Sequence, residues 1–189
     1  MKKDSVENQK EDFISMNNIY LDDVIINFGF GTKEEKKNFL REHASKSIYM
    51  DLTCYDPKEF YEEFPQLKGI FSALFADEAK RIEIHFREEN PLVLNHLKEL
   101  GYHPIQVSFT SCGFIFPRTI SQIINEAYFA LEDGIATKED INRAMKFGVN
   151  YPKGPFEWSE GKELYIKTLL EELHTLTKDN RYIPNKALL

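Results

Sequence analysis

The sequence predicts an α/β part with a mostly parallel sheet, followed by an all-α C-terminal domain. Three observations support this fold class. Strand-like runs alternate with helical segments up to about residue 110. Beyond residue 114 the apolar residues recur every three or four positions, and no strand-like run remains. We therefore expect a flexible segment over 1–17, an α/β domain over 18–111 and a helical domain over 112–189.

The α/β part contains five runs rich in β-branched and aromatic residues. We interpret each as one strand, over 19–28, 47–53, 67–75, 81–86 and 104–109. Thr32 and Glu35 have the spacing of a capping box, which predicts a helix from there to about Ala44. Further helices are expected over 57–64 and 91–100, the second ending before Gly101.

The C-terminal part contains several helices separated by glycine and proline. Apolar residues at helical spacing form one face of the first helix: Phe116, Ile120, Ile123, Ile124, Ala127, Tyr128 and Leu131. Gly134 ends this helix, Thr137 begins the next, and Gly148 closes it. A last helix is expected over 162–176. The tail should dock through its apolar residues Tyr182, Ile183 and Leu188.

The bulk properties exclude several classes of protein. The 189 residues carry a net charge of -7, which argues against non-specific binding to nucleic acid. The sequence shows no apolar run of transmembrane length and no apolar core of a signal peptide, so we expect a cytoplasmic protein. Cys54 and Cys112 are the only cysteines. Their spacing is not that of a zinc site, and we expect buried thiols.

Several short motifs follow one another in the C-terminal part. They are GFI at 113–115, NEA at 125–127, EDGIA at 132–136, EDI at 139–141, MKFG at 145–148 and YPKGPFE at 151–157. Their order and spacing resemble the helical C-terminal domain of 3-hydroxyacyl-CoA dehydrogenases, which oxidise 3-hydroxyacyl-CoA thioesters with NAD. Residues from about Ile19 resemble, more weakly, the second half of that family's Rossmann domain. The resemblance thus implies a truncated, Rossmann-like α/β domain without the first mononucleotide-binding half.

The resemblance also places the family's reacting residues on this sequence. Glu83 falls on the catalytic Glu, but Phe71 falls on the catalytic His and Pro117 on the Asn. A phenyl ring cannot accept the proton of a hydroxyl group, so the general base is lost. The family's S-N-T-S turn falls on 51–54, where Thr53 matches and Cys54 replaces a Ser. These five positions would line the cleft.

Other residues are candidates for the missing roles. His85 lies two positions from Glu83, so both side chains should share a strand face, and it is the remote substitute base. Arg118 and Lys153 are the candidate anion contacts, whereas we interpret the lysines at 33, 36 and 37 as a solvated helix face.

The sequence predicts no cofactor and no metal. Its one G-x-G, at 29–31, is followed by Glu34 where a dinucleotide motif has its third glycine, and by Glu35.

Three functions stay open at this point. The first is a catalytically degenerate 3-hydroxyacyl-CoA dehydrogenase-like protein of fatty-acid or hydroxybutyryl-CoA metabolism, which binds an acyl-CoA or pairs with an active paralogue. The resemblance implies that it forms a homodimer through its helical domain. The second is an active dehydrogenase subunit that takes its NAD-binding half from another chain. The third is a structural dimerisation or interaction module without a ligand.

Overall fold

The computed structural model describes residues 18–76, 80–108 and 111–188. The chain divides into two compact units, a sheet unit and a helical unit. The sheet unit contains the chain up to Leu52 and from Pro57 to 110, and the helical unit contains Thr53–Asp56 and the chain from Ser111 onwards. The expected flexible segment over 1–17 lies outside the described residues.

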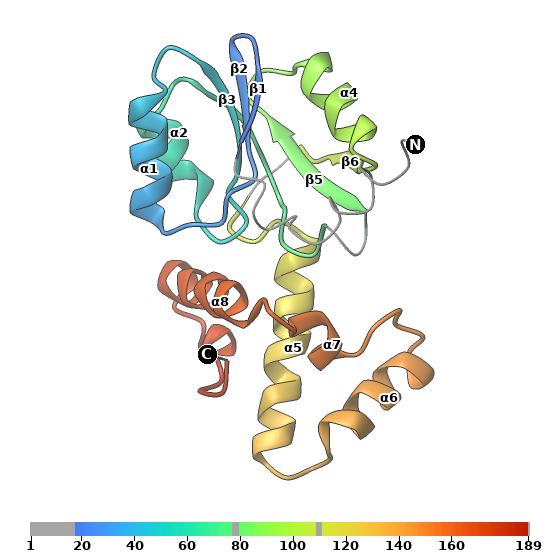
Figure 1. The fold of residues 1–189 in the computed structure, drawn as a ribbon. Coiled ribbons are helices and arrows are strands. Elements are labelled where there is room, and N and C mark those ends of the chain that lie inside the picture. The colour runs from blue at the N-terminus through green and yellow to red at the C-terminus, as the bar shows by residue number, and fades with distance from the viewer. Residues whose placement is uncertain (1–17, 77–79, 109–110, 189) are drawn as a thin grey trace, which may run out of the picture. The chain divides into compact units, whose positions relative to one another are not determined.

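The sheet unit is built on six strands in the order β1-β2-β3-β4-β5-β6 (Figure 1). They are β1 (Asn18–Leu21), β2 (Val24–Asn27), β3 (Ser47–Asp51), β4 (Leu67–Phe71), β5 (Arg81–Phe86) and β6 (His103–Gln106). The pairs β2–β3, β3–β4 and β5–β6 are parallel, and β1–β2 and β4–β5 are antiparallel. The predicted fold class, a mostly parallel sheet followed by helices, is confirmed.

The first predicted strand is in fact a hairpin. The run 19–28 breaks into β1 and β2, which pair antiparallel with Leu21 opposite Val24. Asp22 stands in the turn at φ 50°, a left-handed conformation that Asp tolerates better than most residues. The single-strand prediction was therefore wrong, because the two aspartates inside the apolar run form a tight turn. As a result, β1 covers the edge of β2.

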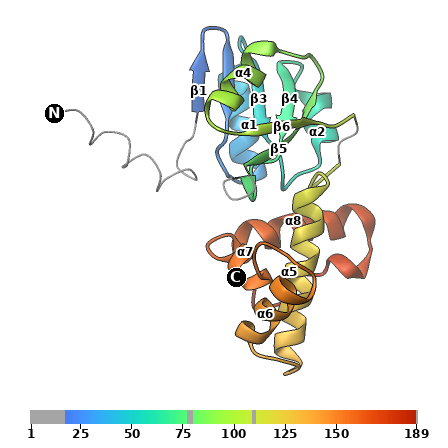
Figure 2. The same ribbon diagram turned by 90° about the vertical axis from the view of Figure 1, so that its right-hand side faces the viewer.

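Helices cover both faces of the sheet. α1 (Lys33–Glu42) and α2 (Pro57–Glu63) lie on one face, and α4 (Pro91–Glu99) lies on the other (Figures 1 and 2). The capping box is present: Glu35 N donates to the Thr32 hydroxyl at 3.2 Å, and Thr32 N donates to the Glu35 carboxylate at 2.7 Å. On the α4 face, the core is a continuous apolar cluster. Its buried members are Ile26, Phe28, Tyr49, Phe71, Ala76, Ile82, Ile84, Val93, Leu97 and Tyr102.

The helical unit contains α5 (Phe116–Glu132), α6 (Lys138–Gly148), α7 (Pro155–Ser159), α8 (Glu163–Thr177) and the 3₁₀ turn η3 (Asn180–Tyr182). Asn125 fastens the chain after η3 to α5. Its Nδ2 donates to Ile183 O at 2.9 Å, and its Oδ1 accepts from Asn185 N at 2.7 Å. Tyr182 and Leu188 are buried, but Ile183 is 44% exposed, because its backbone, not its side chain, makes the docking contact. No helix in the described residues has both the length and the apolar character needed to span a membrane.

Candidate functional site

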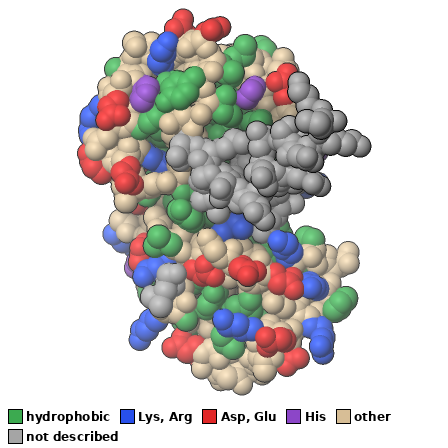
Figure 3. Space-filling model, viewed as in Figure 1, with side chains coloured by type: hydrophobic (Ala, Val, Ile, Leu, Met, Phe, Trp, Pro, Cys, Tyr) green, Lys and Arg blue, Asp and Glu red, His purple; other side chains and the backbone are tan. Residues whose placement is uncertain are grey.

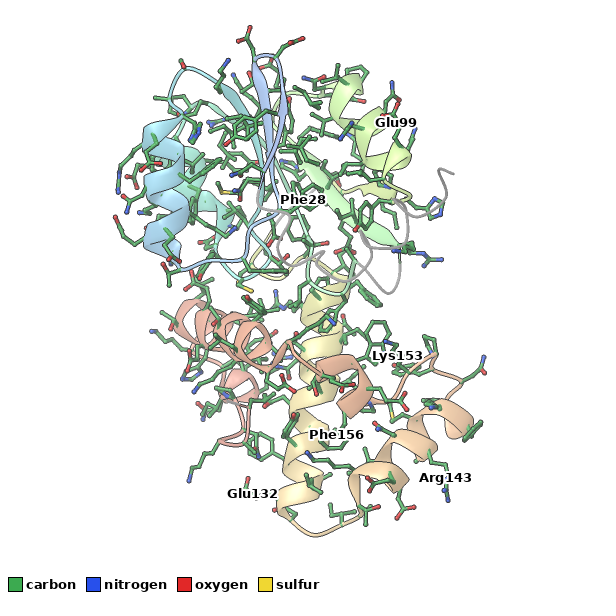
Figure 4. All side chains as sticks on the ribbon, viewed as in Figure 1. Phe28, Glu99, Glu132, Arg143, Lys153 and Phe156 are labelled. Carbon is green, nitrogen blue, oxygen red and sulfur yellow. The ribbon has the colours of Figure 1, made fainter. Side chains whose placement is uncertain are left out.

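Phe71, which the resemblance placed on the catalytic His, is a core residue of the sheet unit. It is the last residue of β4 and has no exposed surface. Its ring packs against Phe28 with ring centroids 4.8 Å apart, and Phe28 lies inside the unit (Figure 4). In the β4–β5 ladder Phe71 lies opposite Ile84, so the two side chains share the face of the sheet covered by α4. The position is thus filled by apolar packing.

Glu83, which falls on the family's catalytic Glu, is buried in β5 with 8% of its surface exposed. It directly precedes Ile84, so strand alternation directs its side chain to the face opposite Phe71. Its backbone is held by Ser72: Glu83 N donates to Ser72 Oγ at 3.2 Å, and Ser72 N donates to Glu83 O at 2.9 Å. The register therefore separates the carboxylate from the position that the resemblance assigns to its partner.

His85, the substitute base suggested by the sequence, lies on β5 two residues after Glu83 and is half-buried. Its Nδ1 lies 3.0 Å from Val107 O, and its ring makes an edge contact with Tyr61 at 6.2 Å. Burial raises the pKa of the Tyr61 phenol above its usual value, and its hydroxyl makes no hydrogen bond in the structure. Packing and a backbone contact thus hold this imidazole in place.

The remaining cleft positions lie in the helical unit. Thr53 is fully buried, and its carbonyl accepts a hydrogen bond from Gly113 N at 2.9 Å. Cys54 is also buried, and its thiol donates to Tyr165 O at 3.4 Å. Pro117 stands in the first turn of α5, where a missing N–H group costs nothing. It provides ring packing in place of an amide side chain.

The two predicted anion contacts have structural roles that the sequence did not suggest. Arg118 Nε donates to the Tyr182 hydroxyl at 3.0 Å, and the guanidinium lies 5.1 Å from the centre of the same ring. Arg118 therefore anchors η3 to the start of α5. Lys153 provides the carbonyl that accepts from the indole of Trp158 at 3.1 Å, and its side chain is drawn in Figure 4. Anion contact by these residues stays a prediction.

The buried pair of Lys36 and Asp51 was missed by the sequence interpretation. Lys36 is only 5% exposed, so the solvated face predicted for it is wrong. Its Nζ donates to Gly29 O at 2.6 Å and to Asp51 O at 2.5 Å. The Asp51 carboxylate accepts from Ala73 N at 3.0 Å. These contacts tie together the C-terminal end of β3 and the chain segments that follow β2 and β4. The signal was available, because Lys36 lies one helical turn before the buried Leu40.

The G-x-G loop also differs from a pyrophosphate site. The Gly29 carbonyl is bound by Lys36, and the first turn of α1 is closed by its own capping box. The Glu35 carboxylate lies against Gly31, where an added Cβ would approach Oε2 to 3.1 Å. Among residues 18–76, 80–108 and 111–188, no group of three His, Cys, Asp or Glu side chains is placed to hold a metal ion.

Residues 113–188 match the family model described as 3-hydroxyacyl-CoA dehydrogenase, C-terminal domain. The predicted resemblance to this family is thereby confirmed. Over 96 residues the chain is 45% identical to 3-hydroxyadipyl-CoA dehydrogenase of Escherichia coli strain K12, covering 49% of this chain and 20% of that protein. Over 93 residues it is 34% identical to 3-hydroxybutyryl-CoA dehydrogenase of Clostridioides difficile, covering 48% and 32%. The chain thus spans between 20% and 32% of the length of these two relatives.

Solved structures extend the similarity into the sheet unit. The structure of 3-hydroxybutyryl-CoA dehydrogenase from Escherichia coli K12 aligns with 92% of this chain and 32% of its own, at 25% identity and a TM-score of 0.62. That of (S)-3-hydroxybutyryl-CoA dehydrogenase from Ralstonia eutropha aligns with 88% of this chain and 63% of its own, at 22% identity and a TM-score of 0.71. The second likeness concerns the fold alone. The comparisons thus show that residues 113–188 are similar to the C-terminal domain of 3-hydroxyacyl-CoA dehydrogenases.

Proposed function

We propose that this chain is a catalytically degenerate 3-hydroxyacyl-CoA dehydrogenase-like protein that binds an acyl-CoA or acts beside an active paralogue. The observation that carries the proposal is the burial of Phe71 in an apolar cluster, at the position where the resemblance places the base. Loss of a general base alone removes a factor of about 10²–10⁴ in rate. The retained Glu83 cannot replace it, because the β4–β5 register directs it to the other face of the sheet.

The residues around the G-x-G loop do not fit a dinucleotide, so no step is assigned to NAD. A pyrophosphate is bound by free N–H groups at the start of a helix. In α1 the Glu35 carboxylate and the Thr32 hydroxyl already occupy that end. Glu34 and Glu35 would in addition repel two phosphate groups. These features support a chain whose G-x-G loop does not bind the cofactor.

We propose that the helical unit forms a homodimer through α6. None of the residues of α6 is fully buried, and large apolar side chains are exposed at and beside it: Ile135 by 74%, Phe147 by 80% and Val149 by 54%. Several large apolar side chains exposed close together in the sequence are typical of a protein–protein interface. On the face of the helical unit that Figure 3 shows, charged side chains of both signs are interspersed, which does not favour a nucleic-acid partner there. A cytoplasmic location remains part of the proposal.

The alternative in which another chain supplies the NAD-binding half meets a physical obstacle. In the doubly wound order 3-2-1-4-5-6, the fourth strand pairs with the first strand of the nucleotide half. By the resemblance β2 is that fourth strand. The edge of β2 that would pair with the nucleotide half is already paired with β1. A complementing half would have to displace β1. The ligand-free interaction module, in contrast, is favoured by the same Phe28–Phe71 packing and stays the second candidate.

Two measurements on the purified chain separate these functions. Turnover of 3-hydroxybutyryl-CoA with NAD should not exceed background, and clear turnover would refute the proposal. Titration calorimetry with acetoacetyl-CoA and with NADH then distinguishes the three candidate functions. Binding of the thioester alone supports the degenerate dehydrogenase, and binding of neither supports the interaction module. Binding of both, only when a paralogue is added, supports the complemented enzyme.

A further inference from the structure

We propose that Cys54 and Cys112 are a redox pair, whose reversible disulfide fastens residues 53–56 to the start of the helical unit. We call residues 53–56 the clip segment. This segment joins β3 to α2, two elements of the sheet unit, yet it packs with the helical unit. Along the sequence, the chain enters the helical unit at Thr53, returns to the sheet unit at Pro57 and enters the helical unit again at Ser111. A bond between Cys54 and Cys112 would lie within the helical unit and would fix the clip segment there.

Hydrogen bonds attach the clip segment to the rest of the helical unit. Gly113 N donates to Thr53 O at 2.9 Å, and the Cys54 thiol donates to Tyr165 O at 3.4 Å. Asp56 N donates to the Glu172 carboxylate at 3.3 Å. Each of these hydrogen bonds contributes about 0.5–1.5 kcal/mol, and segments held by such bonds open locally at a lower free energy than global unfolding requires.

Backbone geometry brings the two cysteines together. The hydrogen bond between Gly113 N and Thr53 O joins the peptide group before Gly113 to the one after Thr53. Cys112 provides the carbonyl carbon of the first group, and Cys54 provides the nitrogen of the second. With standard peptide dimensions and a nearly linear hydrogen bond, their Cα atoms lie within about 7 Å. Disulfides have Cα separations of about 4.4–6.8 Å, so a bond needs at most a small adjustment of the backbone.

The environment of the thiols agrees with this proximity and sets the conditions for oxidation. Both cysteines are buried, at 5% exposure for Cys54 and 2% for Cys112. Burial, and then the neighbouring Cys54, raises the pKa of the Cys112 thiol. A raised pKa lowers the thiolate fraction of Cys112, so this thiol reacts slowly while the clip segment is closed. Opening of the segment would expose the thiols to solvent, so oxidation depends on this local motion.

The oxidation can be written with hydrogen peroxide as the oxidant. One thiol attacks a peroxide oxygen, the O–O bond breaks, and a sulfenic acid and one water form. The second thiol then attacks the sulfenic sulfur, an S–S bond forms, and a second water leaves with the remaining proton. Two thiols and one peroxide thus give one disulfide and two waters. A dithiol reverses the step by thiol–disulfide exchange. Transient disulfides of this kind are the form that thiol regulation takes in a reducing compartment.

The test uses the full chain, treated with hydrogen peroxide under native conditions. Because the chain has only two cysteines, an intrachain disulfide must join them. We expect a product lighter by two hydrogen atoms, restored by dithiothreitol. Hydrogen exchange at the amides of Asp56 and Gly113, which make the clip contacts, should slow at least tenfold in the oxidised chain.

Four outcomes would overturn the proposal. They are thiols that remain alkylatable, chains linked to one another, a disulfide that forms only in urea, and a disulfide that leaves the two amides exchanging at the same rate. The variants Cys54→Ser and Cys112→Ser are the matched controls. Neither should show slower amide exchange after peroxide treatment, and slowing in either variant would count against the bond as its cause.

Discussion

The substitution Phe71→His tests whether position 71 is a core position or a disabled catalytic one. Phe71 has no exposed surface and packs on Phe28 at 4.8 Å. If position 71 keeps the His–Glu geometry that the resemblance implies, an imidazole at this position would pair with the Glu83 carboxylate. If the register is as the structure has it, the imidazole enters an apolar cluster on the opposite face. The two cases predict pH dependences of stability with opposite signs.

The size of the effect follows from burial. Truncation of a buried Phe to Ala costs about 3–5 kcal/mol. An imidazole restores part of that volume but leaves a ring N–H group without a partner, which costs about 1–3 kcal/mol. We therefore expect Phe71→His to lower the free energy of unfolding by about 3 kcal/mol at pH 7.5. The matched variant Phe71→Leu stays apolar and should cost less than about 1.5 kcal/mol.

The sign of the pH dependence decides between the two cases. A neutral imidazole in an apolar cluster has a folded-state pKa below its unfolded value of about 6.5. The unfolded state then binds more protons, so the free energy of unfolding falls as pH falls, by up to about 1.4 kcal/mol between pH 7.5 and 5.5. An imidazole paired with Glu83 would have a raised folded-state pKa, and its stabilisation would grow as pH falls through that value.

The assay is urea denaturation followed by circular dichroism at pH 7.5, 6.5 and 5.5, for the wild type and both variants. The difference between Phe71→His and Phe71→Leu removes the pH dependence common to all three chains. A difference that grows toward pH 5.5 agrees with the core position. A difference that shrinks toward pH 5.5, or a variant that turns over 3-hydroxybutyryl-CoA, would refute the assignment of Phe71 to the core.

Three further predictions concern stability and assembly. Thr32→Ala should lower the free energy of unfolding by about 1 kcal/mol in urea denaturation, because it removes the cap of α1. The pKa of the Glu35 carboxyl is lowered by the Thr32 backbone N–H and then by the Thr32 hydroxyl. In wild type this stabilisation is therefore present above the unfolded pKa and lost as pH falls through the folded one. The variant keeps the backbone N–H and loses the hydroxyl, so the acid limb should weaken only in part, and its complete loss would contradict the larger role of the backbone N–H. Asn125→Ala should cost about 2 kcal/mol in the same assay, because Asn185 N loses its buried acceptor. Phe147→Glu should weaken self-association at least tenfold in sedimentation while Phe147→Leu preserves it, and equal association of both would exclude α6 from the interface.

Local signals in the sequence predicted most helices well, because caps and helical periodicity depend on neighbouring residues. Thr32, Pro57, Pro91 and Thr137 stand at or just before the predicted helix starts in the structure. The hairpin was missed because β-branched and aromatic residues occur on both sides of its turn, so the two strands look like one run. Only the pair Asp22-Asp23 marked the turn, and aspartate is a weaker turn signal than glycine or asparagine.

The candidate site was predicted less completely, because it depends on pairing between distant segments. The resemblance placed the family's His and Glu on Phe71 and Glu83, but the sequence pattern does not contain the register in which β4 and β5 pair. Likewise, Lys36 was assigned to a solvated group of lysines on charge alone. Its buried contacts with the carbonyls of Gly29 and Asp51 arise only when β2 and β3 pair in parallel.

The register that separates Glu83 from position 71 is itself fixed by side-chain chemistry. Shifting β5 by one residue against β4 would turn Ile82 and Ile84 away from the α4 face and bring Glu83 and His85 into the apolar cluster. Two buried aliphatic side chains would lose about 1.5–3 kcal/mol of burial each, and a carboxylate would enter a site without a partner. A pairing that restored a catalytic couple is therefore opposed by the core of the sheet. The β4–β5 pairing places residue 71 on the apolar face covered by α4, and a phenylalanine side chain suits that face.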